Sequence, residues 1–212
     1  TFDTSNSTVS GHPFRLSGIA DGSHNTLYSV DFDGSGDYLT IVNSSDYSFG
    51  SGDFTVECWA YFDDVSEYES LVGMWKASSG YSWLIQTYPD NKISAFLSTS
   101  GSGITSTLTS SSTITTGQWY HIALVVSSSN AKLYIDGLET ASASSIGTLY
   151  NNTSDGLTIG GSQDSGTELL DGKISDLRIV KGTAVYTSNF SPPAVSLTNI
   201  TNTKLLCCNQ ST

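Results

Sequence analysis

Short segments in which apolar and polar residues alternate recur from residue 28 to the end of the chain, and this period of two constrains the fold more than any other feature. The clearest segment is Phe54–Tyr61, where every second residue from Phe54 to Ala60 is apolar and the opposite face also carries large side chains. Turns rich in Gly, Ser and Asn separate the segments, and none of useful length has the period of a helix. The sequence therefore predicts an all-β, antiparallel two-sheet β-sandwich, with strand 54–61 covered on both faces.

The pattern also divides the chain. Residues 1–27 are polar and are predicted to form an N-terminal extension, a linker or an edge strand, whereas residues 28–212 form one domain. A Ser/Thr-rich stretch at 99–116 is predicted to be an edge strand or a long loop, and 186–190 a short helix. The predicted strands are 28–32, 38–42, 54–61, 70–76, 82–88, 92–98, 119–126, 131–135, 157–159, 172–180 and 203–207.

Charge and hydropathy exclude two classes of partner. The formal net charge is −12, and the few basic residues form no cluster, so binding to nucleic acid or to an anionic membrane is not expected. No apolar run approaches the ~20 residues of a membrane-spanning helix, so membrane insertion is not expected either. The polar first ten residues show no signal peptide, and because residue 1 is not Met we expect a fragment or a processed chain.

The three cysteines, Cys58, Cys207 and Cys208, are too few for a disulfide framework. Cys58 lies in an apolar strand and is predicted to be a buried thiol, with a bridge to Cys207 or Cys208 left open. Because neighbouring residues of a strand point to opposite faces, we expect only one of the adjacent pair to face the core.

Several ordered motifs resemble those of laminin-G-like domains in the concanavalin A-like lectin superfamily. The motifs are Val30–Leu39, Phe54–Trp59, Gly117–Val125, Lys132–Gly137, Leu157–Gly161 and Leu170–Ile179. The resemblance implies a jelly roll and a binding or structural module, not an enzyme. On the penultimate predicted strand, Asp176 and Arg178 share one face and are predicted to pair.

Three shorter segments, His12–Ser17, Asp21–Asn25 and Thr203–Ser211, resemble segments of structural proteins from marine bacteriophages. This resemblance implies a component of the virion surface, such as a tail fibre, a knob or a capsid decoration. It also implies either a host surface glycan or neighbouring virion subunits as partners, with a homo-oligomer left open, and a location on the virion or otherwise outside the cell.

Catalysis is not expected. Jelly-roll glucanases that retain configuration carry E-x-D-x-x-E on one strand, and this spacing is absent from the sequence. Glu67 and Glu69 are predicted to lie in a solvated loop, and His121 is predicted to be a buried, hydrogen-bonded imidazole. The alternative function is a carbohydrate-active enzyme or its carbohydrate-binding appendage.

Candidate binding residues follow from the lectin resemblance. Aromatic side chains that stack on sugar rings are the usual glycan-binding device, and carboxylates in rim loops hold calcium in some relatives. The glycan-binding candidates are Tyr68, Trp75, Tyr81, Trp83 and Tyr88. The calcium-binding candidates are Asp63, Asp64, Glu67 and Glu69, or alternatively Asp155, Asp164, Glu168 and Asp171.

Overall fold

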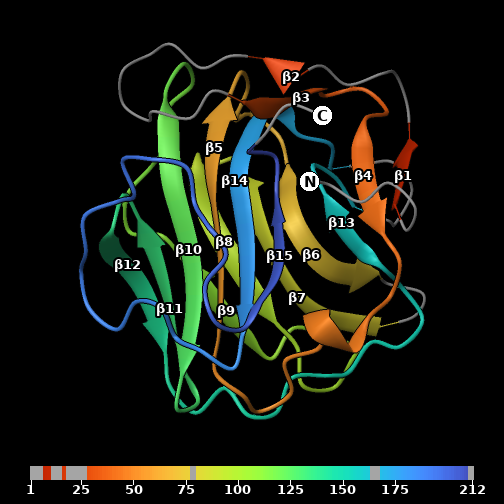
Figure 1. Cartoon of the computed structure of the whole chain (residues 1–212), viewed down its shortest axis with the longest axis vertical. Coiled ribbons are helices and arrows are strands. Elements are labelled where there is room, and N and C mark those ends of the chain that lie inside the picture. The colour runs from red at the N-terminus through yellow and green to blue at the C-terminus, as the bar shows by residue number, and fades with distance from the viewer. Residues whose placement is uncertain (1–6, 11–15, 18–27, 77–79, 163–167, 210–212) are drawn as a thin grey trace.

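Two antiparallel sheets lie face to face in the computed structural model, which describes residues 7–10, 16–17, 28–76, 80–162 and 168–209 (Figure 1). The first sheet has seven strands, in the spatial order β1 (Ser7–Ser10), β4 (Tyr38–Ile41), β13 (Leu157–Ile159), β6 (Ser70–Lys76), β7 (Gly80–Tyr88), β8 (Lys92–Leu97) and β9 (Ser106–Thr109). The second has eight, in the order β12 (Leu138–Ala143), β11 (Asn130–Ile135), β10 (Trp119–Ser127), β5 (Phe54–Phe62), β14 (Asp171–Lys181), β3 (Ser29–Asp33) and β2 (Leu16–Ser17), with β15 (Thr203–Cys207) beside β14. This architecture confirms the predicted all-β sandwich.

The strand predictions agree with the structure in most places. The strand β12 was not predicted, and the stretch 99–116 contains the short strand β9. The prediction of a helix at 186–190 is wrong: the ring of Tyr186 stacks on that of Phe190 at 3.6 Å, and the Phe190 backbone donates to Gly137 in the turn between β11 and β12. Within residues 1–27, Ser7–Ser10 and Leu16–Ser17 form edge strands, and the rest lies outside the described residues.

Alternating residues of β5 build the core between the sheets. Phe54, Val56 and Cys58 point inward and join one large apolar cluster that Trp83 also enters from β7. The Trp83 indole donates to the Tyr47 carbonyl at 3.0 Å, beside a 3.9 Å stack between Phe49 and Phe54. Burial of these large aromatic surfaces is the main source of stability in such a sandwich.

All three cysteines are buried free thiols, so the open possibility of a bridge from Cys58 to Cys207 or Cys208 is not realised. The expectation that only one of the adjacent pair faces the core is wrong. Cys208 follows the end of β15 and has a φ of 63°, which ends the alternation of the strand, so both cysteines enter the core cluster.

The chain between β14 and β15 covers the outer face of the eight-stranded sheet (Figure 1). Its residues Ala184, Tyr186 and Phe190 pack against a small apolar cluster of Ala123, Val125 and Tyr134. We call residues 183–199 the strap. The strap also contacts the outer face of β5 at Thr55 and Glu57, and β5 is buried along almost its whole length, which confirms the prediction that both of its faces are covered.

Beneath the strap lies a buried ionic cluster centred on Glu57. Arg178 donates from Nη2 and Nε to Glu57 Oε1 at 2.6 and 2.9 Å, while Tyr186 and His121 contact Oε2 at 2.8 and 3.1 Å. Burial alone would raise the pKa of Glu57, but His121, Arg178 and Tyr186 together hold it below its usual range. The predicted role of His121 is thus confirmed.

The predicted pair of Asp176 with Arg178 is wrong. A register shift in β14 between Ser175 and Arg178, with Asp176 at a φ of 50°, breaks the alternation on which the prediction depended. The Asp176 carboxylate accepts instead from the backbone of Leu197 in the strap, at 2.9 Å.

Candidate functional site

Aromatic side chains form a continuous row on the outer face of the seven-stranded sheet, which is the face opposite the core. Tyr68 meets Tyr88 at 4.7 Å between ring centroids, and Tyr88 meets Phe96 at 5.7 Å. Phe96 in turn lies 6.1 Å from Trp75, which stacks on Tyr81 at 4.3 Å. We call these five residues the aromatic track. None belongs to the apolar cluster between the sheets, and Tyr68 is 45% exposed.

The track includes four of the five predicted glycan-binding residues, and Trp83 is the exception. Strict alternation would place Tyr81 and Trp83 on the same face of β7. A register shift pairs Met74 with Trp83 but Trp75 with Tyr81, so the two aromatic residues point to opposite faces. Trp83 is 0% exposed in the core, and it is therefore not available to a ligand. The track gains Phe96, which the sequence does not distinguish from a core residue.

Polar groups lie on the same face as the track. Gln86 follows Leu84 on the outer side of β7 and pairs in register with Ser94, whose hydroxyl lies 3.0 Å from that of Thr109. Gln86 is 4% exposed, and its amide nitrogen has no hydrogen-bond partner within the described part of the chain. A buried amide without a partner is costly, so this donor favours a ligand that brings an acceptor.

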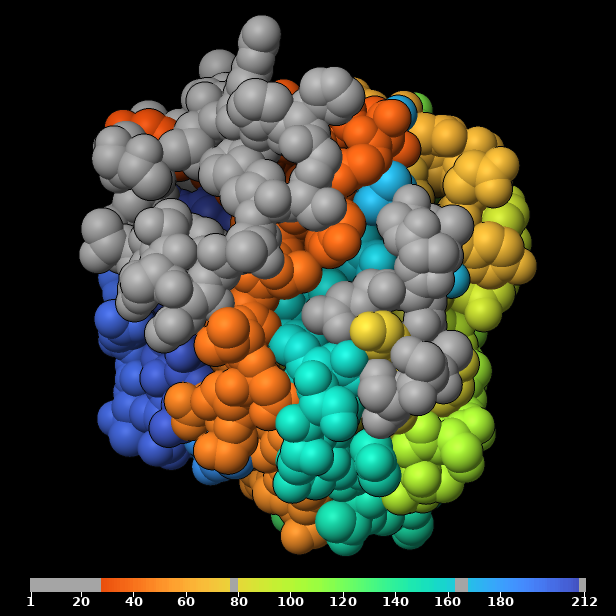
Figure 2. Space-filling model, turned by 90° about the vertical axis from the view of Figure 1, so that its right-hand side faces the viewer, coloured from red at the N-terminus to blue at the C-terminus, as the bar shows by residue number. Residues whose placement is uncertain are grey.

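An acidic pocket of about 550 Å³ opens at one end of the track. Segments far apart in sequence meet there: β3 and its turn, the loop before β6, and the chain leading into β14 (Figure 2). The lining residues are Asp33, Gly34, Asp64, Glu67, Tyr68, Glu69, Glu168, Leu169 and Asp171. They include six carboxylates and no basic residue, and Tyr68 belongs to both the pocket and the track.

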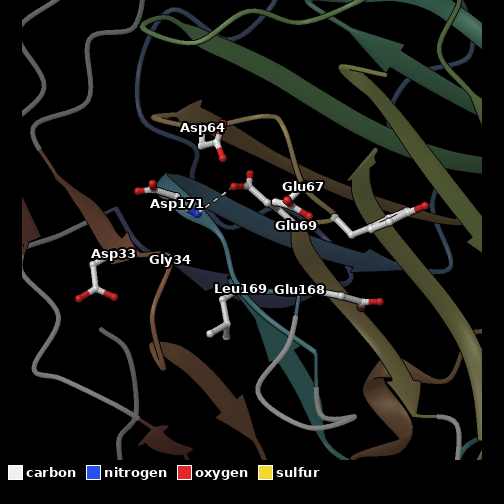
Figure 3. A pocket seen from close by; sticks show the side chains of 9 residues that line it. Asp33, Gly34, Asp64, Glu67, Glu69, Glu168, Leu169 and Asp171 are labelled. Atoms are coloured by element: carbon white, nitrogen blue, oxygen red, sulfur yellow. Dashed lines mark hydrogen bonds between the residues drawn. The ribbon is translucent and has the colours of Figure 1, made fainter. Parts of the chain in front are cut away.

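Glu69 is the buried carboxylate of this pocket, so the prediction that it lies in a solvated loop is wrong. It is 2% exposed, and its Oε1 accepts from the Asp171 backbone at 3.3 Å (Figure 3). Its Oε2 is buried and has no hydrogen-bond partner among the residues described. Burial raises the pKa of Glu69 to about 8, opposed by the hydrogen bond from Asp171 and reinforced by the Asp64 and Asp171 carboxylates. Burial and neighbouring carboxylates also raise the pKa of Asp171.

The other predicted calcium ligands divide between this pocket and other places. Asp64 lies in the pocket but is engaged by the backbone and hydroxyl of Ser66, and Asp63 lies outside it, 3.1 Å from Lys173. Glu67 lines the rim.

The alternative calcium set is also dispersed. Glu168 and Asp171 line the pocket, whereas Asp155 bridges to Lys76 at 3.5 Å and Asp164 lies outside the described residues. Across the described ranges, no three Asp, Glu, His or Cys side chains converge closely enough to hold a metal ion. Calcium takes about 6–8 oxygen ligands, so a calcium site here would also need backbone carbonyls or water, and calcium binding stays a prediction.

The raised pKa of Glu69 predicts a measurable dependence of stability on pH. Between the unfolded-state pKa and about 8, the folded protein keeps a proton that the unfolded chain has released. Stability is therefore full below the unfolded-state pKa and falls as pH rises, by at most about 1.4 kcal/mol per pH unit for one group. In urea unfolding at pH 5 to 8, Glu69→Gln should flatten this decline and gain stability relative to the wild type at pH 8. Equal slopes for the two proteins would show that Glu69 is ionised in the fold.

Comparison with known proteins gives a family model and a set of structures. The model described as Laminin_G_3, concanavalin A-like lectin/glucanases superfamily, matches residues 33–185. No curated protein matches the sequence. Within the described residues, no helix is long and apolar enough to cross a membrane.

Three solved structures have a similar fold. One, from Bacteroides ovatus, is described as a "putative carbohydrate binding protein" and has a TM-score of 0.66 at 14% identity, covering 85% of this chain and 50% of its own. The binding domain of Paraclostridial Mosquitocidal Protein 1 gives 0.65 at 16% identity, with 85% and 45% covered. Domain 4 of AbnA, an extracellular GH43 arabinanase from Geobacillus stearothermophilus in complex with arabinotriose, gives 0.62 at 18% identity, with 84% of both chains covered. The chain spans about half the length of the first two, and these identities establish similarity of fold alone.

Proposed function

The chain belongs to the concanavalin A-like lectin/glucanases superfamily, and from this premise we propose that it is a non-catalytic module that binds glycans along the aromatic track. The observation that carries the proposal is the partly exposed row of rings beside the unpartnered amide of Gln86. On the opposite outer face the strap packs over part of β10 and β11.

The chemistry of the track suits a chain of sugars. The C–H groups of a sugar ring pack on an aromatic face, while its hydroxyls need hydrogen-bond partners at the edge of the site. Trp75 and Tyr81 supply a stacked pair at one end, and Tyr88 lies two ring contacts away through Phe96. Gln86 and Ser94 lie on the sheet between these ends. This spacing favours a ligand of more than one sugar ring.

The known structures support the same class of ligand. The printed description of the Bacteroides ovatus protein concerns carbohydrate binding, and the arabinanase domain was solved with arabinotriose. Both share the sandwich fold with this chain, and the aromatic track supplies the independent support from its own side chains.

Trp75→Ala tests the proposal. A glycan array should first identify an oligosaccharide that binds the wild type, and calorimetry should then show at least about a tenfold loss of affinity in the variant, because an aromatic anchor of a binding site is worth about 1–2 kcal/mol or more. The control is Tyr61→Ala, which removes a half-buried ring from the outer face of the other sheet. Equal affinity of Trp75→Ala and wild type for the array ligand would contradict binding along the track.

A carbohydrate-active enzyme is the second candidate, and one observation favours it. A buried carboxyl with a raised pKa beside other carboxylates is what a general acid in glycoside cleavage needs. We expect no release of reducing ends when the protein is incubated with the polysaccharides that it binds. If the wild type released reducing ends and Glu69→Gln did not, the protein would be a hydrolase and not a non-catalytic binding module.

We propose further that the module is displayed on a virion surface, as part of a tail fibre, a knob or a capsid decoration, where it meets host glycans or neighbouring subunits. The support is the resemblance of His12–Ser17, Asp21–Asn25 and Thr203–Ser211 to phage structural proteins. Mass spectrometry of purified particles should detect peptides of this chain; their absence from particles would contradict the assignment.

A further inference from the structure

The acidic pocket and the aromatic track form one continuous surface through Tyr68. This ring lines the pocket and contacts Tyr88 of the track at 4.7 Å. Tyr88 also lies within electrostatic range of Glu168, which lines the pocket, because burial first, and then Tyr68 and Glu168, raise the pKa of Tyr88. A glycan lying on the track would therefore place a terminal ring or a branch at the mouth of the pocket.

Within the pocket, Glu69 is the group that still needs a partner. Its carboxylate is turned toward Asp64 and Asp171 (Figure 3), and its Oε2 accepts no hydrogen bond from any described residue. At 2% exposure, such an oxygen is expensive to leave without a hydrogen-bond partner. The amine of Lys173, two residues after Asp171, is already engaged with Asp31 and Asp63 at 3.4 and 3.1 Å. The missing partner is thus expected from a ligand.

The shape and charge of the pocket favour an organic cation over a metal ion. Its volume of about 550 Å³ lies in the range of small-molecule sites, and the carboxylates line a broad wall instead of converging on one point. An ammonium group carries three N–H donors, and the ring of Tyr68 offers it an electron-rich face. We propose that this pocket binds the protonated primary amine of an amino sugar, so that the module selects glycans with de-N-acetylated hexosamine units.

This inference rests on the proposed glycan site and adds a chemical class to it. An N-acetylated sugar has no positive charge to satisfy the carboxylates, and its acetyl group would lie among them. A free amine supplies both charge and donors. Because burial raises the pKa of Glu69 to about 8, an ammonium ligand that pairs with its carboxylate at pH 6.5 should displace a proton as it binds.

The test compares matched ligands in calorimetry at pH 6.5 on the whole chain. The probes are oligomers of glucosamine and of galactosamine, each beside the fully N-acetylated oligomer of the same length. The wild type should bind at least one amine-bearing oligomer about tenfold or more tightly than its acetylated partner, as expected for a charge-assisted hydrogen bond. Titration in two buffers of different ionisation enthalpy should show proton release for the amine only.

Glu69→Gln should reduce this preference to less than about threefold and abolish the proton release. Glu67→Gln, at an exposed position on the rim, should weaken the preference without touching the buried carboxyl. The control is Glu139→Gln, which removes the same charge from the exposed pair with Lys132 and should leave the preference unchanged.

Three outcomes would overturn the inference. Equal binding of amine and acetylated oligomers, or no binding of any amine-bearing oligomer, would show that the pocket is not an ammonium subsite. The glycan site on the aromatic track is tested separately, by the array and by Trp75→Ala. Binding of calcium chloride alone that is lost in Glu69→Gln would assign the pocket to a metal ion. A loss of affinity for array ligands in Trp75→Ala, together with no preference for amines, would leave the proposed function intact.

Discussion

Arg178→Met is expected to lower the free energy of unfolding by about 3–5 kcal/mol, the largest effect of any single substitution considered for this protein. The substitution keeps the long side chain but removes the guanidinium that donates two hydrogen bonds to Glu57 at 2.9 and 2.6 Å. Glu57 is fully buried, so its carboxylate would remain beneath the strap with only His121 and Tyr186 as partners. Breaking one partner of a buried ion pair is costly because the other is left without compensation.

Urea denaturation at neutral pH measures this loss. The matched control is Lys132→Met, which breaks the exposed contact between Lys132 and Glu139 at 2.8 Å and should cost less than about 1 kcal/mol. If the two variants lost the same stability, the buried cluster would contribute no more than a surface ion pair.

The second large effect is expected from Gly137→Ala, in the turn between β11 and β12. Gly137 has a φ of 75°, and an added Cβ would lie 1.9 Å from the carbonyl oxygen of Phe190 in the strap. The left-handed conformation costs a non-glycine residue about 1–2 kcal/mol, and forcing the strap away adds about 1–3 kcal/mol. We therefore expect a loss of about 3 kcal/mol in urea denaturation.

Gly117→Ala separates these two costs. Gly117 has a φ of 84°, but a Cβ there would meet no described atom within 4 Å. Its alanine variant should lose only about 1–2 kcal/mol, the conformational part. Proteolysis should also cut the strap faster in Gly137→Ala than in Gly117→Ala, since only the first displaces Phe190. Equal losses of unfolding free energy in both variants would mean that displacement of the strap does not destabilise the fold.

Alternation was enough to predict the sandwich, because one face of each central strand must be apolar to fill the core. It was also enough for the two covered faces of β5, where Phe54 and Val56 point one way and Glu57 and Trp59 the other. It failed beside two register shifts. The shift beside Trp75 places Tyr81 and Trp83 on opposite faces, and at the shift in β14 Asp176 and Arg178 contact the adjacent strap residues Leu197 and Thr198 instead of each other. The sequence around these positions does not predict either register shift.

The candidate site was less predictable than the fold, since it depends on contacts between distant segments. Four track residues were predicted from their aromatic character, but Phe96 and Gln86 lie in strands whose residues look equally suited to the core. The acidic pocket joins residues near 33, 64–69 and 168–171, and the sequence alone does not show that these segments meet.

The three free thiols have a practical consequence for where this protein can fold and work. Cys58, Cys207 and Cys208 are buried without a bridge, and burial raises the pKa of Cys58, so its reactive thiolate is scarce. No cystine holds the sheets together, so reducing agents have no covalent link to break. The fold described here should therefore form without disulfide chemistry, in a reducing or an oxidising compartment.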